Sequence, residues 1–219
     1  MDLVKFSKDI YELTDKLSKN LKAQDLPKLN NVGKQLISMY QKNLVKINHS
    51  VLELICASNL IARGHSVEVE KQISDILVCD IFAKKGGGTT IVEIETGFTP
   101  PDHAMDTIDY FSARIMSKIA RYSKHCSKFS LATPVIGIIP IPKIFLLPPN
   151  ARDNSEVKKI KELCDRYYKN PLIDYDDILN AHLHSIYLIN IDKGFAKELD
   201  PQGYVELTHR LLQRSEVDY

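Results

Sequence analysis

Two β-like runs, residues 75–83 and 89–98, flank the glycine-rich segment KKGGG and constrain the fold more than any other feature. Two such runs around a flexible tight turn predict a β-hairpin. If the turn is centred between the first two glycines, Asp80 lies directly opposite Glu93. Like charges that face each other across two paired strands are destabilising. The hairpin therefore predicts a pair of carboxylates that needs a partner.

The acidic residues of this hairpin interrupt segments that are otherwise suited to burial. Glu93 and Glu95 alternate with Val92 and Ile94, so the two acids share one face of the strand. A half-buried cluster of carboxylates is costly unless a cation lies between its members. Oxygen ligands suit hard cations, so we expect an Mg²⁺ or Mn²⁺ site. The alternative is a wet sheet surface on which the acids meet lysines.

Helical periodicity dominates the N-terminal part of the chain. Apolar residues recur at three- and four-residue spacing over 3–21, and a second pattern covers 32–44 after a break around Pro27. We expect these segments to form a helical extension, residues 1–48, whose apolar stripe could also support a homodimer. A third helix is predicted over 51–63.

Further periodic segments lie on both sides of the hairpin. The expected elements are strands at 65–71, 131–139 and 184–191, a helix that starts at Thr99, and helices near 155–169 and 203–214. Helix, three strands, helix and strand in this order indicate an α/β or α+β core. We assign residues 49–150 to this core and residues 151–219 to a C-terminal α/β segment packed on it.

Composition narrows the class of protein. The net charge is +1, so no overall field favours or disfavours a nucleic-acid partner. The four cysteines are far apart and form no CxxC pair, which argues against a zinc ribbon. The most apolar stretch is broken by prolines and a lysine and is too short to span a bilayer, and the N-terminus does not have the pattern of a signal peptide. We expect a cytoplasmic protein with no membrane partner.

At the acidic residues the sequence resembles the PD-(D/E)XK, or restriction-endonuclease-like, nuclease superfamily over roughly 50–140. Glu53 matches the glutamate of the family's first core helix, Asp80 matches its metal-binding aspartate, and Glu93-Ile94-Glu95 matches the (D/E)-x-K tripeptide. The sequence also resembles a group of archaeal proteins within this superfamily. The resemblance implies an α/β fold with a mixed central sheet flanked by helices.

The resemblance further implies a set of site residues. The expected metal ligands are Asp80, Glu93 and the carbonyl of Ile94, and the expected catalytic residues are Asp80, Glu93, Glu95 and Glu53. Glu95 stands where the family has lysine, and there it would orient or deprotonate a water molecule. Lys71 or Lys118 would then substitute for the lysine. For Glu53, the alternative is a structural salt bridge.

Basic residues follow the hairpin on a predicted helix. Arg114, Lys118 and Arg121 are spaced to form one stripe, and with Lys71 they are the expected contacts to nucleic-acid phosphates. The alternative is a solvated helix face. We expect a metal-dependent nuclease that hydrolyses DNA phosphodiester bonds. Two other classes stay open: a non-catalytic nucleic-acid-binding module, and a protein-interaction module that uses the N-terminal helices.

Overall fold

A computed structural model describes residues 2–217 and shows one six-stranded sheet with the order β1-β2-β3-β4-β5-β6. The strands are β1 (Ser66–Gln72), β2 (Val78–Lys85), β3 (Gly88–Ile94), β4 (Lys128–Pro134), β5 (Ser185–Asn190) and β6 (Phe195–Leu199). Strands β1 to β3 are antiparallel, β3 to β5 are parallel, and β5 and β6 are antiparallel. The expected α/β fold with a mixed sheet is confirmed.

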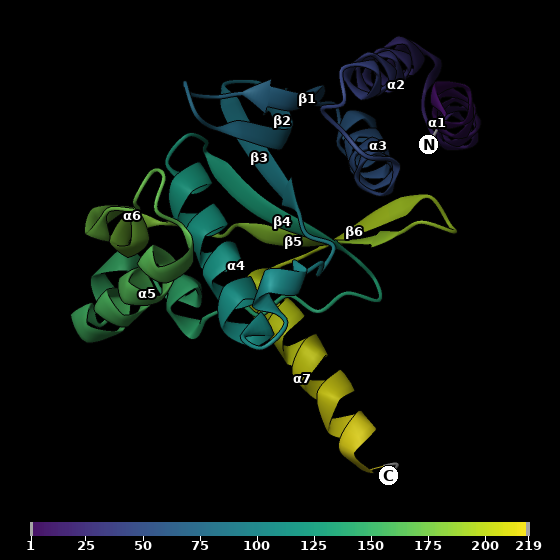
Figure 1. Cartoon of the computed structure of the whole chain (residues 1–219). Helices are drawn as coiled ribbons and strands as arrows, with labels where there is room; N and C mark the ends of the chain where they lie inside the picture. Colours follow the sequence, from purple (N-terminus) through teal and green to yellow (C-terminus); the bar gives the residue numbers. More distant parts are fainter. Residues whose placement is uncertain (1, 218–219) are drawn as a thin grey trace.

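Helices cover both faces of this sheet (Figure 1). They are α1 (Leu3–Ser18), α2 (Leu26–Gln41), α3 (Ile47–Ala62), α4 (Thr107–Ser123), α5 (Asn154–Tyr167), α6 (Tyr175–Asn180) and α7 (Pro201–Val217). Helices α1 to α3 lie on one side, α4 to α6 lie on the other, and α7 extends away from the sheet. None of the helices within residues 2–217 is long and apolar enough to cross a membrane.

Two apolar clusters lie between the helical layers and the sheet and pack them together. One joins α1 to α3 to the sheet and includes Phe6, Ile10 and Leu36, each with no exposed surface. The other lies under α4 to α6. The apolar stripe of the N-terminal helices is therefore buried within the chain. A homodimer through these helices stays a prediction, and it would have to use other residues.

The hairpin has the expected register. Ile81 pairs with Val92 and Lys85 pairs with Gly88, so the turn lies between them at Gly86 and Gly87. Gly86 has a φ of 59°, in the left-handed region that glycine adopts without strain. The turn chemistry of the glycine run therefore places Asp80 and Glu93 at neighbouring positions on adjacent strands.

Several predicted boundaries are wrong. A short 3₁₀ turn, Pro101–His103, follows Thr99, and the long helix begins only at Thr107. Proline restricts the residue before it to extended conformations, so consecutive prolines delay the helix. Pro27, expected to mark a break, instead lies in the first turn of α2, where its missing N–H costs nothing. The predicted strand at 131–139 ends at Pro134. Strand β6 and helix α6 were not predicted.

Candidate metal centre and its buried ion pairs

Helix α3 supplies two side chains of the candidate site. His49 and Glu53 are one turn apart, so they lie on the same face of the helix. Most of α3 is apolar and buried against the sheet, and this packing carries Glu53 into the interior with no exposed surface. Glu53 was expected at the site, whereas His49 was not.

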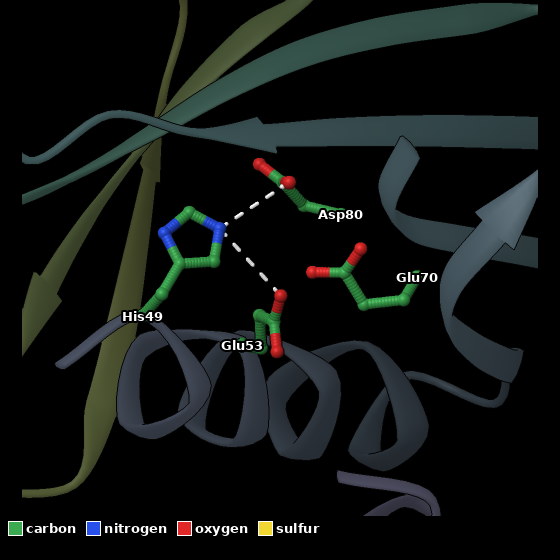
Figure 2. A group of neighbouring side chains, drawn as sticks. All are labelled: His49, Glu53, Glu70 and Asp80. Atoms are coloured by element: carbon green, nitrogen blue, oxygen red, sulfur yellow. Dashed lines mark ion pairs between the residues drawn. The ribbon is translucent and has the colours of Figure 1, made fainter. Parts of the chain in front are cut away.

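The sheet supplies Asp80 from β2 and Glu70 from β1. Val69 pairs with Ile81 and Lys71 pairs with Cys79, which brings Glu70 and Asp80 to facing positions. Glu70 has a φ of 48°, a left-handed conformation that is uncommon for residues other than glycine and that clusters at functional sites. Figure 2 shows the side chains of α3 and of the two strands pointing toward one another.

These four residues form a compact group of possible metal ligands. One ligand atom from each of His49, Glu53, Glu70 and Asp80 lies within 4.8 Å of all the others. His49 Nε2 is 3.2 Å from Asp80 Oδ1 and 3.5 Å from Glu53 Oε1. The cluster could therefore hold a metal ion.

The Glu53 carboxyl tests whether the cluster suits a cation. Both of its oxygens are buried, and among the side chains that the structure describes they lie beside the His49 imidazole, which forms an ion pair with Oε1 at 3.5 Å, and beside the carboxyl of Glu70, but no amide, hydroxyl or ammonium group donates to either. Burial, followed by the charges of Asp80 and Glu70, raises the pKa of Glu53 well above its ordinary range. A buried carboxyl without a donor is destabilising. A divalent cation would satisfy these oxygens, so the residues present fit a metal.

On the other side of Asp80, Lys118 of α4 neutralises the remaining acids. Its Nζ is 2.8 Å from Glu95 Oε1, 3.0 Å from Glu93 Oε2 and 3.8 Å from Asp80 Oδ2. Glu93 is 1% exposed and Glu95 is 3% exposed, so the wet-surface alternative is wrong for both. The partner that the facing carboxylates require is thus an ammonium group of the chain.

Lys118 also touches the third group that was expected to bind metal. Its Nζ donates to the Ile94 carbonyl oxygen at 3.3 Å. Burial alone would lower the pKa of Lys118, but the carboxylates of Glu93, Asp80 and Glu95 outweigh burial and raise it. Of the expected ligands, Asp80 alone belongs to the His49 cluster, while Glu93 and the Ile94 carbonyl face the ammonium group.

Asp80 reaches both layers because the alternation of β2 is interrupted there. Ile81 packs in the cluster under α3, whereas Cys79, which strict alternation would place beside it, packs in the cluster under α4. The backbone N–H of Asp80 donates to Glu93 Oε1 at 3.1 Å, and the N–H of Ile94 donates to Asp80 Oδ2 at 2.5 Å. At this position the carboxyl groups of Asp80 and Glu93 therefore accept hydrogen bonds from the backbone N–H groups that would otherwise bond to the carbonyl oxygens of the neighbouring strand.

The other predicted phosphate contacts have partners within the chain. Arg114 forms an ion pair with Glu95 at 3.1 Å. Arg121 donates to the Pro171 carbonyl oxygen and lies over the ring of Tyr168. Contacts of these arginines with nucleic acid stay a prediction, and such contacts would have to compete with these partners.

The two lysines that were considered as substitutes for the family lysine have different partners. Lys71 pairs with Glu68 at 2.5 Å and lies over the ring of Phe82, away from the acidic cluster. Lys118 is the lysine at the site. The alternation of a regular strand would place Glu70 on the same face as Glu68, but the left-handed backbone of Glu70 brings it to the cluster with His49, Glu53 and Asp80.

Comparisons with protein families, with curated proteins and with solved structures give no match to this chain.

Proposed function

We propose that this chain is a metal-dependent phosphodiesterase that acts on DNA, with its cation held by His49, Glu53, Glu70 and Asp80. One observation supports the metal centre most directly: the fully buried carboxyl of Glu53 has no amide, hydroxyl or ammonium donor and faces an imidazole and two further carboxyls, all of them possible ligands. Such a group is retained in a fold when a cation or a shared proton satisfies it.

The arrangement of the elements supports phosphodiester chemistry. Helix α3, the antiparallel strands β1 to β3, helix α4 and the parallel strand β4 follow the order of the core of the superfamily that the sequence resembles. Glu53 on α3, Asp80 on β2 and Glu93 on β3 fall on the elements that carry the matching residues there. This support rests on the resemblance.

The donor set favours Mn²⁺ over Mg²⁺. Three carboxylates suit either ion, whereas an imidazole is a better ligand for a softer cation than Mg²⁺. When bound, a divalent cation supplies Lewis acidity to a phosphate and lowers the pKa of water. His49 and Glu53 come from one helix and Glu70 and Asp80 from two strands, so the packing of α3 on the sheet sets the spacing of the ligands.

Glu93 and Glu95, which contact Lys118, lie beside the proposed metal ligand Asp80 and have their own roles in the site. Burial and the charge of Asp80 raise the pKa of Glu93 to about 8, so its carboxyl can hold or release a proton near neutral pH. Glu95 forms ion pairs with both Lys118 and Arg114, which makes it a positioning residue that holds the ammonium group against Glu93. Lys118 supplies the positive charge that the family places at the position of Glu95.

One observation favours a protein-interaction module, although on a surface other than the N-terminal helices that the sequence suggested. An apolar hollow of about 550 Å³ lies among α4, α7 and residues 138–142. Ile108 at its edge is 79% exposed, and Leu211 of α7 is 51% exposed. Exposed apolar surfaces of this kind mark binding sites for other proteins.

Incubation of labelled single-stranded, duplex and branched DNA with Mn²⁺, Mg²⁺ or EDTA separates these functions. We expect Mn²⁺-dependent cleavage that Asp80→Asn abolishes while circular dichroism shows an unchanged fold. Asp75→Asn is the matched control, because Asp75 is an exposed acid in the loop before β2. Cleavage by Asp80→Asn at the wild-type rate would refute the site. If the wild type cleaves none of these substrates, salt-sensitive binding of the same DNA assigns the chain to the nucleic-acid-binding module, and absence of binding favours the interaction module.

A further inference from the structure

A second polar hollow lies at the carboxyl end of α3. It has a volume of about 440 Å³ and continues into a smaller one of about 150 Å³ that shares four of its residues. We call this hollow the basic pocket, because its lining includes two lysines, an arginine and two histidines: Arg63, His65, Lys85, Lys128 and His184. They come from the end of α3, the ends of the hairpin strands, the start of β4 and the segment before β5. Residues far apart in the sequence thus converge on one depression.

Positive charge prevails in the basic pocket. Among the described residues that line it, Glu198 is the single acid, and it is paired with Arg63. No ion pair joins Lys85 or Lys128 to an acid among the side chains that the structure describes, those of residues 2–212. Burial, followed by the charge of Lys128, lowers the pKa of His184. The two lysines therefore carry charge that the protein does not offset.

Contacts with the end of α3 hold two of the nitrogen-bearing side chains of the basic pocket in place. Lys85 Nζ donates to the Arg63 carbonyl oxygen at 2.7 Å, and His65 Nδ1 is 3.0 Å from the Leu60 carbonyl oxygen. The Leu60 carbonyl also accepts from the backbone N–H groups of Arg63 and His65, so the end of α3 and these two side chains are fixed by one set of contacts. Lys85 keeps two of its three N–H donors for another partner. A ligand would thus meet side chains that are already ordered, which reduces the entropy cost of binding.

We propose that the basic pocket binds a phosphate group. Lysine and imidazole donors form charge-assisted hydrogen bonds with phosphate oxygens, and the hydroxyls of Thr90 and Ser127 line the same hollow. A carboxylate would be favoured by a free guanidinium fork, but that of Arg63 is engaged by Glu198. The ammonium groups of Lys85 and Lys128 and the hydroxyls of Thr90 and Ser127 are donors without a planar fork, and such donors suit the tetrahedral oxygens of a phosphate group.

This phosphate is distinct from one at the metal centre. Glu53 lies near the middle of α3 and Arg63 caps its carboxyl end, so the rise of an α-helix over ten residues separates them by about 15 Å. The proposal does not depend on catalysis, because the basic pocket contains none of the candidate metal ligands. Its ligand is either free phosphate and phosphomonoesters, or a backbone phosphate of a nucleic acid.

Titration of the ¹⁵N-labelled protein with inorganic phosphate in EDTA tests the proposal. We expect saturable amide shifts centred on Thr90, Lys128 and His184, and binding about tenfold weaker in Lys128→Gln, which removes a charge-assisted hydrogen bond. Lys34→Gln, at an exposed lysine of α2, is the control for net charge and should bind as wild type does. Asp80→Asn should also bind normally, which separates this pocket from the metal centre.

Competition then distinguishes the two sources of phosphate. Displacement of phosphate by a short single-stranded oligonucleotide, in a manner weakened by Lys128→Gln, assigns the pocket to a nucleic-acid backbone. Retention of bound phosphate assigns it to small phosphate compounds. Absence of saturable shifts at the pocket, or equal binding by Lys128→Gln and wild type, would overturn the proposal and leave Lys85 and His65 as caps of α3.

Discussion

Replacement of Glu93 by glutamine should flatten the pH dependence of stability in the metal-free protein. Glu93 is almost fully buried between Asp80 and Lys118, and its pKa is raised from 4.5 to about 8. The glutamine side chain has nearly the same volume and keeps an oxygen that can accept from the Asp80 N–H. The variant therefore removes a titrating group with little change in packing.

The sign of the effect follows from proton binding. Between pH 4.5 and 8 the folded chain keeps the Glu93 proton while the unfolded chain releases it, so stability falls as the pH rises. The slope for one proton is about 1.4 kcal/mol per pH unit, and the whole interval corresponds to at most about 5 kcal/mol. This stabilising contribution is fully present below pH 4.5 and is lost as the pH rises through 8.

Urea unfolding in EDTA at intervals from pH 5 to 9 measures this effect. The free energy of unfolding should fall more steeply for wild type than for Glu93→Gln, and the two curves should diverge most between pH 5 and 8. Glu12→Gln is the control, because Glu12 is an exposed glutamate of α1 and its replacement should leave the slope unchanged. Parallel curves for wild type and Glu93→Gln would refute the inference that Glu93 holds a proton in the folded state.

Two further changes test the parts of the site on either side of Asp80. Saturating Mn²⁺ should raise the melting temperature of the wild type, with about 2.7 kcal/mol gained at a hundredfold excess over Kd, and Glu53→Gln should lose most of this gain because it loses a ligand charge. A thermal shift that Glu53→Gln retains in full would exclude Glu53 as a ligand. Lys118→Met should lower the free energy of unfolding in EDTA at pH 8 by about 3–5 kcal/mol, because it leaves buried carboxylates without a counter-charge. Chemical denaturation would detect this loss, and a variant as stable as wild type would show that Lys118 does not neutralise the cluster.

Local patterns were sufficient to predict the hairpin and the acids that it carries. Turn chemistry at the glycine run and the two-residue period of the strands are properties of neighbouring residues, so the register of Asp80 against Glu93 could be read from the sequence. The burial of Glu93 also follows from the apolar residues that flank it. These features depend on few residues and on no distant contact.

The partners of these acids could not be predicted in the same way. His49 was missed because the predicted helix began at residue 51, whereas α3 begins at Ile47 and places His49 one turn before Glu53. A search for ligand types four residues before Glu53 would have found it. Glu70 joins the cluster through a left-handed backbone conformation, which the alternation of a regular strand does not predict.

The role of Lys118 depends on tertiary packing. Its place on the basic stripe suggested contact with phosphates, but the packing of α4 against the sheet directs it to Glu93 and Glu95 instead. Short elements such as β6 and α6 carry too few residues for a periodic signal. Sequence periodicity therefore predicts the elements better than it predicts which charged side chains meet.

The residues of the site are distributed over two helical layers and the sheet, so the site forms only when both layers have packed on the sheet. His49 and Glu53 come from one layer, Lys118 comes from the other, and Asp80 lies on the strand between them. A chain in which only one layer has docked lacks either two ligands or the counter-charge for Glu93. A metal ion that needs all four ligands would therefore bind late in folding. Completely folded molecules would bind it, and partly folded ones would not.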